Sequence, residues 1–156
     1  MGPVADKIQQ LLKRKESGAL VAFLLYEDSA SCARAEEFCQ ELIRTVTVSQ
    51  LSKRAWLCNQ LRQNRLRNIA IQETLSADIV VLSLHYAETL APEVTGWLKA
   101  WLAATSRQPR LIVGLFEEIG PGAFSSMQAD LEQITTEAGI DLVVVSSHVP
   151  EDGVAY

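Results

Sequence analysis

The chain lacks the features that several common protein classes require. No stretch reaches the roughly 18 consecutive apolar residues needed to cross a bilayer. Met1–Asp6 shows no basic segment followed by an apolar core, so we expect no secretory signal and a cytoplasmic location. There are 3 cysteines and no Cys-x-x-Cys pair, which argues against a disulfide framework or a zinc site. We interpret Cys32 and Cys39, which lie seven residues apart on one predicted helical face, as small buried hydrophobes, with reactive thiols as the alternative.

Basic charge and glycine motifs are also scarce. With 14 Lys and Arg against 19 Asp and Glu, the net charge is −5, which disfavours non-specific binding to nucleic acid or an anionic membrane. No Gly-x-Gly-x-x-Gly follows the first apolar run, and neither Gly-x-Ser-x-Gly nor a Gly-Lys-Ser/Thr loop occurs. These absences count against dinucleotide binding and against hydrolase and nucleotidase activities.

What the chain does contain is a regular alternation of two patterns. Short runs rich in β-branched residues predict strands, and stretches with helical periodicity lie between them. Three runs are almost continuously apolar, as in strands buried on both faces, whereas the second run alternates as an exposed edge strand would. The predicted strands are Leu20–Tyr26, Thr45–Leu51, Asp78–Leu84, Arg110–Phe116 and Asp141–Val145.

The helical stretches complete this pattern. An extra helix over Val4–Glu16 precedes the first strand, and Lys53–Leu75 is predicted as two short helices or one kinked helix. Pro92 opens a further helix, and Gly139 terminates the last. A chain of 156 residues that is 48% hydrophobic suits one domain, divided into an N-terminal helix (1–18), an α/β core (19–147) and a tail (148–156).

Alternating strands and helices predict an α/β fold with a parallel sheet between two helical layers. Five strands in this length suit a three-layer, doubly wound domain of strand order 2-1-3-4-5, the flavodoxin-like order. Ligands of such domains collect at the carboxyl ends of the strands, where the chain direction reverses between the first and third strands. Candidate site residues should therefore lie in the loops at that edge.

Polar residues do follow these strands. Glu27 and Asp28 could hold a divalent metal, whereas Ser29 and Ser31 at a helix N-terminus could accept an anion, and the alternative is that Asp28 or Ser29 only caps the helix. A histidine beside a carboxylate would have acid–base potential. The candidate ligand-binding residues are Glu27, Asp28, Ser29, Ser31, His85, Tyr86 and Glu117.

Trp97 and Trp101 lie four residues apart on one helical face. Large aromatics are enriched at interface hot spots, so this pair is a candidate interaction surface. The alternative is packing in the core. A protein partner or a homo-oligomer is therefore expected rather than nucleic acid or a membrane.

The acids after the first strand, in a domain of this architecture, resemble those of two-component receiver domains over Ala19–Ser147. The resemblance implies that Glu27 and Asp28 are metal ligands. Receivers end the third strand in a phosphoacceptor aspartate and carry a lysine after the fifth, whereas this chain has Leu82-Ser83-Leu84-His85 and Ser146. The segments Ala55–Leu57, Asn68–Ala70, Ser76–Ser83 and Gly96–Leu102 also resemble uncharacterised bacterial proteins of similar length.

These observations favour a non-catalytic, receiver-like signalling or interaction module in the cytoplasm. The alternative is a small-ligand-binding protein or enzyme that uses Glu27, Asp28, His85 and Tyr86 at the strand ends. No cofactor is predicted, because the loop after the first strand lacks the glycine of a flavin phosphate loop. A divalent metal at Glu27 and Asp28 remains the alternative.

Overall fold

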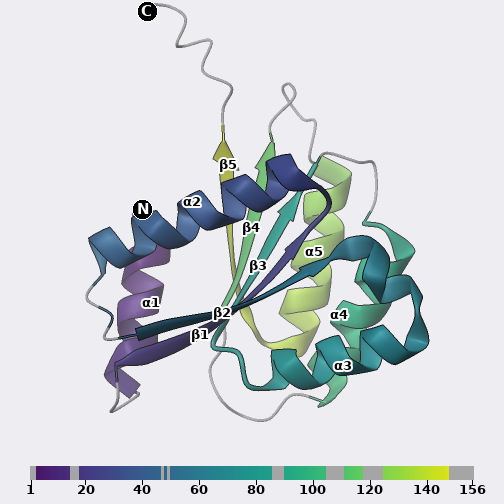
Figure 1. Cartoon of the computed structure of the whole chain (residues 1–156), viewed down its shortest axis with the longest axis horizontal. Helices are drawn as coiled ribbons and strands as arrows, with labels where there is room; N and C mark the ends of the chain where they lie inside the picture. Colours follow the sequence, from purple (N-terminus) through teal and green to yellow (C-terminus); the bar gives the residue numbers. More distant parts are fainter. Residues whose placement is uncertain are drawn as a thin grey trace, which may run out of the picture.

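The computed structural model describes residues 3–14, 18–46, 48, 50–85, 90–104, 111–117 and 125–147. Five parallel strands form one sheet of order β2-β1-β3-β4-β5, which confirms the predicted fold class (Figure 1). The strands are β1 (Ala19–Tyr26), β2 (Gln50–Leu57), β3 (Ile79–Leu84), β4 (Leu111–Glu117) and β5 (Asp141–Ser147).

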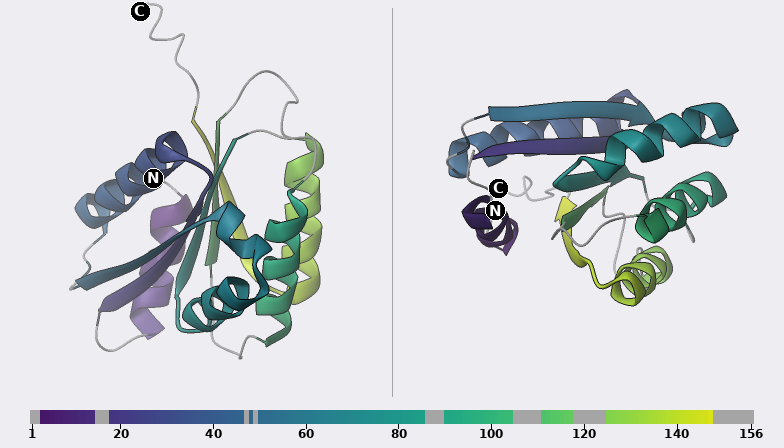
Figure 2. Two further views of the ribbon diagram at one scale, coloured as in Figure 1. Left: turned by 45° about the vertical axis from the view of Figure 1, so that its right-hand side comes forward. Right: turned by 90° about the horizontal axis from the view of Figure 1, so that it is seen from below.

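Two helical layers cover the sheet, as the view along its edge shows (Figure 2). One face carries α3 (Asn64–Leu75), preceded by the 3₁₀ turn η1 (Cys58–Arg62), together with α4 (Pro92–Ala104) and α5 (Ser125–Ala138). The opposite face carries α2 (Ser29–Thr45) and the N-terminal α1 (Pro3–Arg14).

The uneven division of the helices follows from the strand order. Right-handed crossovers that move in one direction along a parallel sheet place their helices on one face, and a reversal moves them to the other. Three crossovers run from β2 towards β5, and only the step from β1 to β2 runs the other way. Without α1, the face behind β4 and β5 would therefore lack a helix.

The core has two parts, one on each side of the sheet. The first lies under α3, α4 and α5, and its largest members are Phe23, Trp97, Trp101 and Phe116. The second lies under α1 and α2, and includes Ile8, Leu24, Phe38, Leu42 and Val113. Every residue of β3 is buried, as expected for the central strand.

The predicted position of the second strand is wrong. The helix α2 continues to Thr45, and the backbone N–H of Val46 bonds to the carbonyl of Leu42, so of the described residues in the predicted strand Thr45–Leu51 only Gln50 and Leu51 lie in a strand. The strand β2 instead begins at Gln50, and its last residues were predicted as helix. It pairs with β1 in register from Ala19↔Gln50 to Tyr26↔Leu57.

The prediction that Trp97 and Trp101 form an exposed interaction surface is also wrong. Both side chains are 0% exposed. The two indole rings stack with centroids 6.1 Å apart, and Trp97 stacks on Phe23 of β1 at 5.4 Å. Burial of such large apolar rings between α4 and the sheet stabilises the fold more than their exposure would, so the pair packs in the core.

Candidate functional site

The loop between β1 and α2 is organised by a capping box. Asp28 is the N-cap of α2, and its Oδ1 accepts the backbone N–H of Ser31 at 2.9 Å. The hydroxyl of Ser31 in turn accepts the backbone N–H groups of Glu27 and Asp28 at 2.9 and 3.0 Å. These bonds satisfy amides that a helix start otherwise leaves unpaired, so the predicted capping role of Asp28 is confirmed.

Ser31 does not offer its hydroxyl to a ligand. The residue is 0% exposed, and its carbonyl accepts the hydroxyl of the buried Ser83 on β3 at 2.7 Å. Ser29, two residues earlier, is exposed. Of the two serines predicted as ligand contacts, Ser31 is structural and only Ser29 faces solvent.

His85 joins this loop to the end of β3. Its backbone N–H donates to Glu27 Oε1 at 2.5 Å, and its Nε2 lies 2.7 Å from Asp28 Oδ2. The register of β1 and β3, with Tyr26 opposite Ser83, places residues 28 and 85 at the same level. The structure thus brings together Glu27, Asp28 and His85, as the strand order predicted.

The electrostatics of this cluster favour an ionised Asp28. The backbone N–H of Ser31, followed by the hydrogen bond from His85, lowers the pKa of Asp28 from 3.8 to about 2. The side chains of Asp28 and His85 are 52% and 35% exposed, so water screens their interaction. Tyr86 and the side chain of Glu117 lie outside the described residues.

Within the described parts of the chain, no group of three His, Cys, Asp or Glu side chains lies close enough to hold a metal ion. Glu27 and Asp28 already bond to His85. A metal at these two residues stays a prediction that no observation supports.

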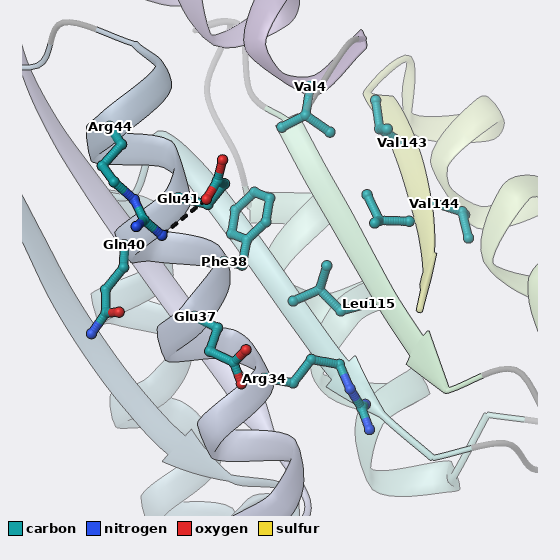
Figure 3. A pocket seen from close by; sticks show the side chains of 11 residues that line it. Val4, Arg34, Glu37, Phe38, Gln40, Glu41, Arg44, Leu115, Val143 and Val144 are labelled. Carbon is teal, nitrogen blue, oxygen red and sulfur yellow. Dashed lines mark hydrogen bonds and ion pairs between the residues drawn. The ribbon is translucent and has the colours of Figure 1, made fainter. Parts of the chain in front are cut away.

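A second candidate site, which the sequence analysis missed, lies on the α1–α2 face. An open groove of about 660 Å³ runs between α2 and the strands β4 and β5 at one edge of the sheet (Figure 3). Val4 of α1 stands at one end, and Leu115 of β4 with Val143 of β5 lies on an aliphatic floor (Figure 3). Val144 and Val145 also line the groove. The groove exists because α1 shares this face with α2 but does not cover the whole of β4 and β5.

The wall that α2 contributes carries a regular charge pattern. Arg34, Glu37, Glu41 and Arg44 line the groove at spacings of three, four and three residues, which place them along one side of the helix. Arg44 donates to Glu41 at 2.9 Å. The same spacing is visible in the sequence beside the apolar stripe of this helix, so it could have been found there.

Comparisons with known proteins extend the description of the fold. The chain matches no protein-family model, and no curated protein matches it. A solved structure of the Trp repressor binding protein from Bacillus subtilis aligns with a TM-score of 0.51 and 9% sequence identity, over 82% of this chain and 83% of that one. At this identity the similarity shows the fold alone. That fold is flavodoxin-like, in agreement with the strand order.

No helix among the described residues is long and apolar enough to cross a membrane.

Proposed function

We propose that the protein is a cytoplasmic, receiver-like interaction module that acts without catalysis and binds an amphipathic helix of a partner protein in the α1–α2 groove. The groove carries this proposal. It is open, has a volume of about 660 Å³ and has an aliphatic floor. Helix-in-groove binding uses such a surface.

The charges on α2 specify the partner further. Along the groove they read positive, negative, negative, positive from Arg34 to Arg44, over about 15 Å of helix. A partner helix with acidic, basic, basic and acidic residues at the matching spacing would be complementary along the whole wall. The pattern reads the same in both directions, so it does not select the orientation of the partner helix.

The cluster of Glu27, Asp28 and His85 at the strand ends, here called the strand-end cluster, supports a non-catalytic function for a separate reason. The cap of α2 and the bond to His85 occupy the carboxylate of Asp28, and the hydroxyl of Ser31 is buried within the cap. Groups that hold a loop together in this way contribute mainly to stability.

Selection of helical peptides from a display library on the full chain tests the groove. The double substitution Glu41→Arg with Arg44→Glu keeps both charges on the helix but inverts their order on the wall. It should weaken the binding of enriched peptides about tenfold in Kd, or by about 1.4 kcal/mol. Ile43→Ser is the matched control, because Ile43 lies on the same helix, is 52% exposed and does not line the groove. Equal binding by both variants, or no enrichment of amphipathic helices, would contradict the proposal.

A second candidate function rests on the separation of 2.7 Å between Asp28 Oδ2 and His85 Nε2. A carboxylate that orients an imidazole is the arrangement used for general acid–base chemistry. If this pair binds a small ligand, a screen of small anions and metabolites should give hits that His85→Ala abolishes while Glu41→Arg with Arg44→Glu keeps them. The interaction module predicts no hit that depends on His85.

A further inference from the structure

The two edge strands of the sheet differ in how they meet solvent. β2 carries exposed Lys53, Arg54 and Ala55 near its middle, and charged side chains on an edge discourage pairing with another chain. β5 has no charged residue after Asp141. Its middle residues, from Leu142 to Val145, are all aliphatic and all partly exposed.

The side chains from Leu142 to Val145 are incompletely covered on both faces of the sheet. Val143 and Val145 pack against the core under α1 and α2 and line the groove there. Leu142 and Val144 pack against the core under α3, α4 and α5, and they line a second hollow beside α5. Among the described residues, only β4 pairs with β5, so its other backbone edge carries no ladder.

We propose that β5 is a self-association surface, on which a second copy of this chain pairs its own β5 in antiparallel orientation to give a dimer with a continuous ten-stranded sheet. The inference depends on β5 alone and goes beyond the groove and its partner helix. An edge strand whose middle residues are aliphatic, uncharged and partly exposed is the feature that natural sheets otherwise avoid or cover. Seven residues supply an edge of about 23 Å.

The sequence of β5 selects a second copy as the occupant. A twofold axis perpendicular to the sheet leaves corresponding faces of the two copies on the same side of the joined sheet. Because directly opposed residues point to the same side, the axis must pass between two copies of one residue. With Val144 on the axis, Val143 lies opposite Val145, and Leu142 lies opposite Ser146. Asp141 then faces Ser147, so no like charges meet across the strands.

Other registers match less well. An axis at Val143 would place Asp141 opposite Val145, which sets a carboxylate against an aliphatic side chain. An axis at Val145 would place Val143 opposite Ser147 and Val144 opposite Ser146. Only the axis at Val144 pairs three consecutive valines with valines.

Disulfide trapping in the full chain tests both the strand and the register. In a Cys32→Ser background, Val144→Cys should give about tenfold more disulfide-linked dimer than Ala55→Cys on the β2 edge, because directly opposed Cβ atoms lie roughly 4.5–5.5 Å apart. Val143→Cys, which would oppose Val145 rather than itself, should cross-link less than Val144→Cys. Equal trapping at residues 55 and 144 would overturn the proposal.

Light scattering on the unmodified protein provides the independent arm. The mass should be twice 17.2 kDa at high micromolar concentration. Val144→Lys should return it to the monomer while Ala55→Lys should not, with circular dichroism used to verify that both variants are folded. A monomer at all concentrations would overturn the proposal. Glu41→Arg with Arg44→Glu should dimerise normally, so failure of the dimer and failure of groove binding are distinguishable.

Discussion

Replacement of Ser31 by alanine tests whether the strand-end cluster is structural. The hydroxyl of Ser31 accepts two backbone N–H groups, from Glu27 and Asp28, at 2.9 and 3.0 Å. Each amide deprived of its partner costs about 1–3 kcal/mol when water cannot replace the acceptor, and the lower end applies here because Glu27 and Asp28 are exposed. We therefore expect Ser31→Ala to reduce the free energy of unfolding by about 2 kcal/mol.

For a chain of this size, about 2 kcal/mol corresponds to a fall in Tm of roughly 4–8 °C. Urea unfolding followed by far-ultraviolet circular dichroism measures the free energy directly, and tryptophan fluorescence checks that the transition is two-state. Ser29→Ala is the matched control. Ser29 lies in the same helical turn but is exposed, so its replacement should change stability by less than about 0.5 kcal/mol.

The contrary result is equally specific. If Ser31→Ala and Ser29→Ala have the same effect on unfolding, the capping box does not hold the loop. The strand-end cluster would then not be mainly structural, and the result would favour ligand binding at this cluster.

Three further predictions concern Asp28, two glycines and two buried cysteines. Hydrogen bonds lower the pKa of Asp28 to about 2. The stability that the ionised side chain contributes is therefore complete above its ordinary pKa of 3.8 and is lost as the pH falls through about 2. Asp28→Asn should flatten the dependence of Tm on pH over that interval. Gly114→Ala should lower the free energy of unfolding in urea by about 1–3 kcal/mol, since the added Cβ would lie 3.0 Å from Phe116 Cζ. Gly96→Ala inside α4 should raise it by up to about 1 kcal/mol, since the added Cβ meets only Arg67 Nη1 at 3.6 Å. Burial raises the pKa of the Cys39 and Cys58 thiols to about 11 and about 12, so a thiol reagent should label both at neutral pH only after denaturation, and rapid labelling of the folded chain would contradict their burial.

The sheet could be predicted from the sequence because its inner strands are buried on both faces. Val80, Val81, Ile112 and Val113 give runs with almost no polar interruption, and the structure places all four in the core. The meeting of Asp28 with His85 follows from the strand order alone, because neighbouring parallel strands end at one edge.

The edge strand β2 could not be located in this way. Its residues Lys53, Arg54 and Ala55 were predicted as helix. Their exposed side chains give no strand pattern, because an edge strand gains its conformation from pairing with β1 rather than from burial of its own side chains. Trp56 at its end bonds through Nε1 to Glu73 of α3 at 2.8 Å, a tertiary contact that no local pattern encodes.

The groove was missed for a related reason. Its floor belongs to β4 and β5, its wall to α2 and one end to α1, so it depends on how far α1 extends over the sheet. Periodicity assigns each side chain to an inner or outer face, but it does not state which inner residues the neighbouring helix leaves uncovered. Trp97 and Trp101 illustrate the same limit, because helical spacing put them on one face without indicating that this face meets β1.

The most direct test of the central claim is a nuclear magnetic resonance titration of the ¹⁵N-labelled chain with a helical peptide enriched on it. The interaction module predicts that backbone amide shifts concentrate along α2 from Arg34 to Arg44 and on β5 from Val143 to Val145, the residues that line the groove. Shifts centred instead on Asp28 and His85, with the groove unchanged, would contradict it and would assign binding to the strand-end cluster.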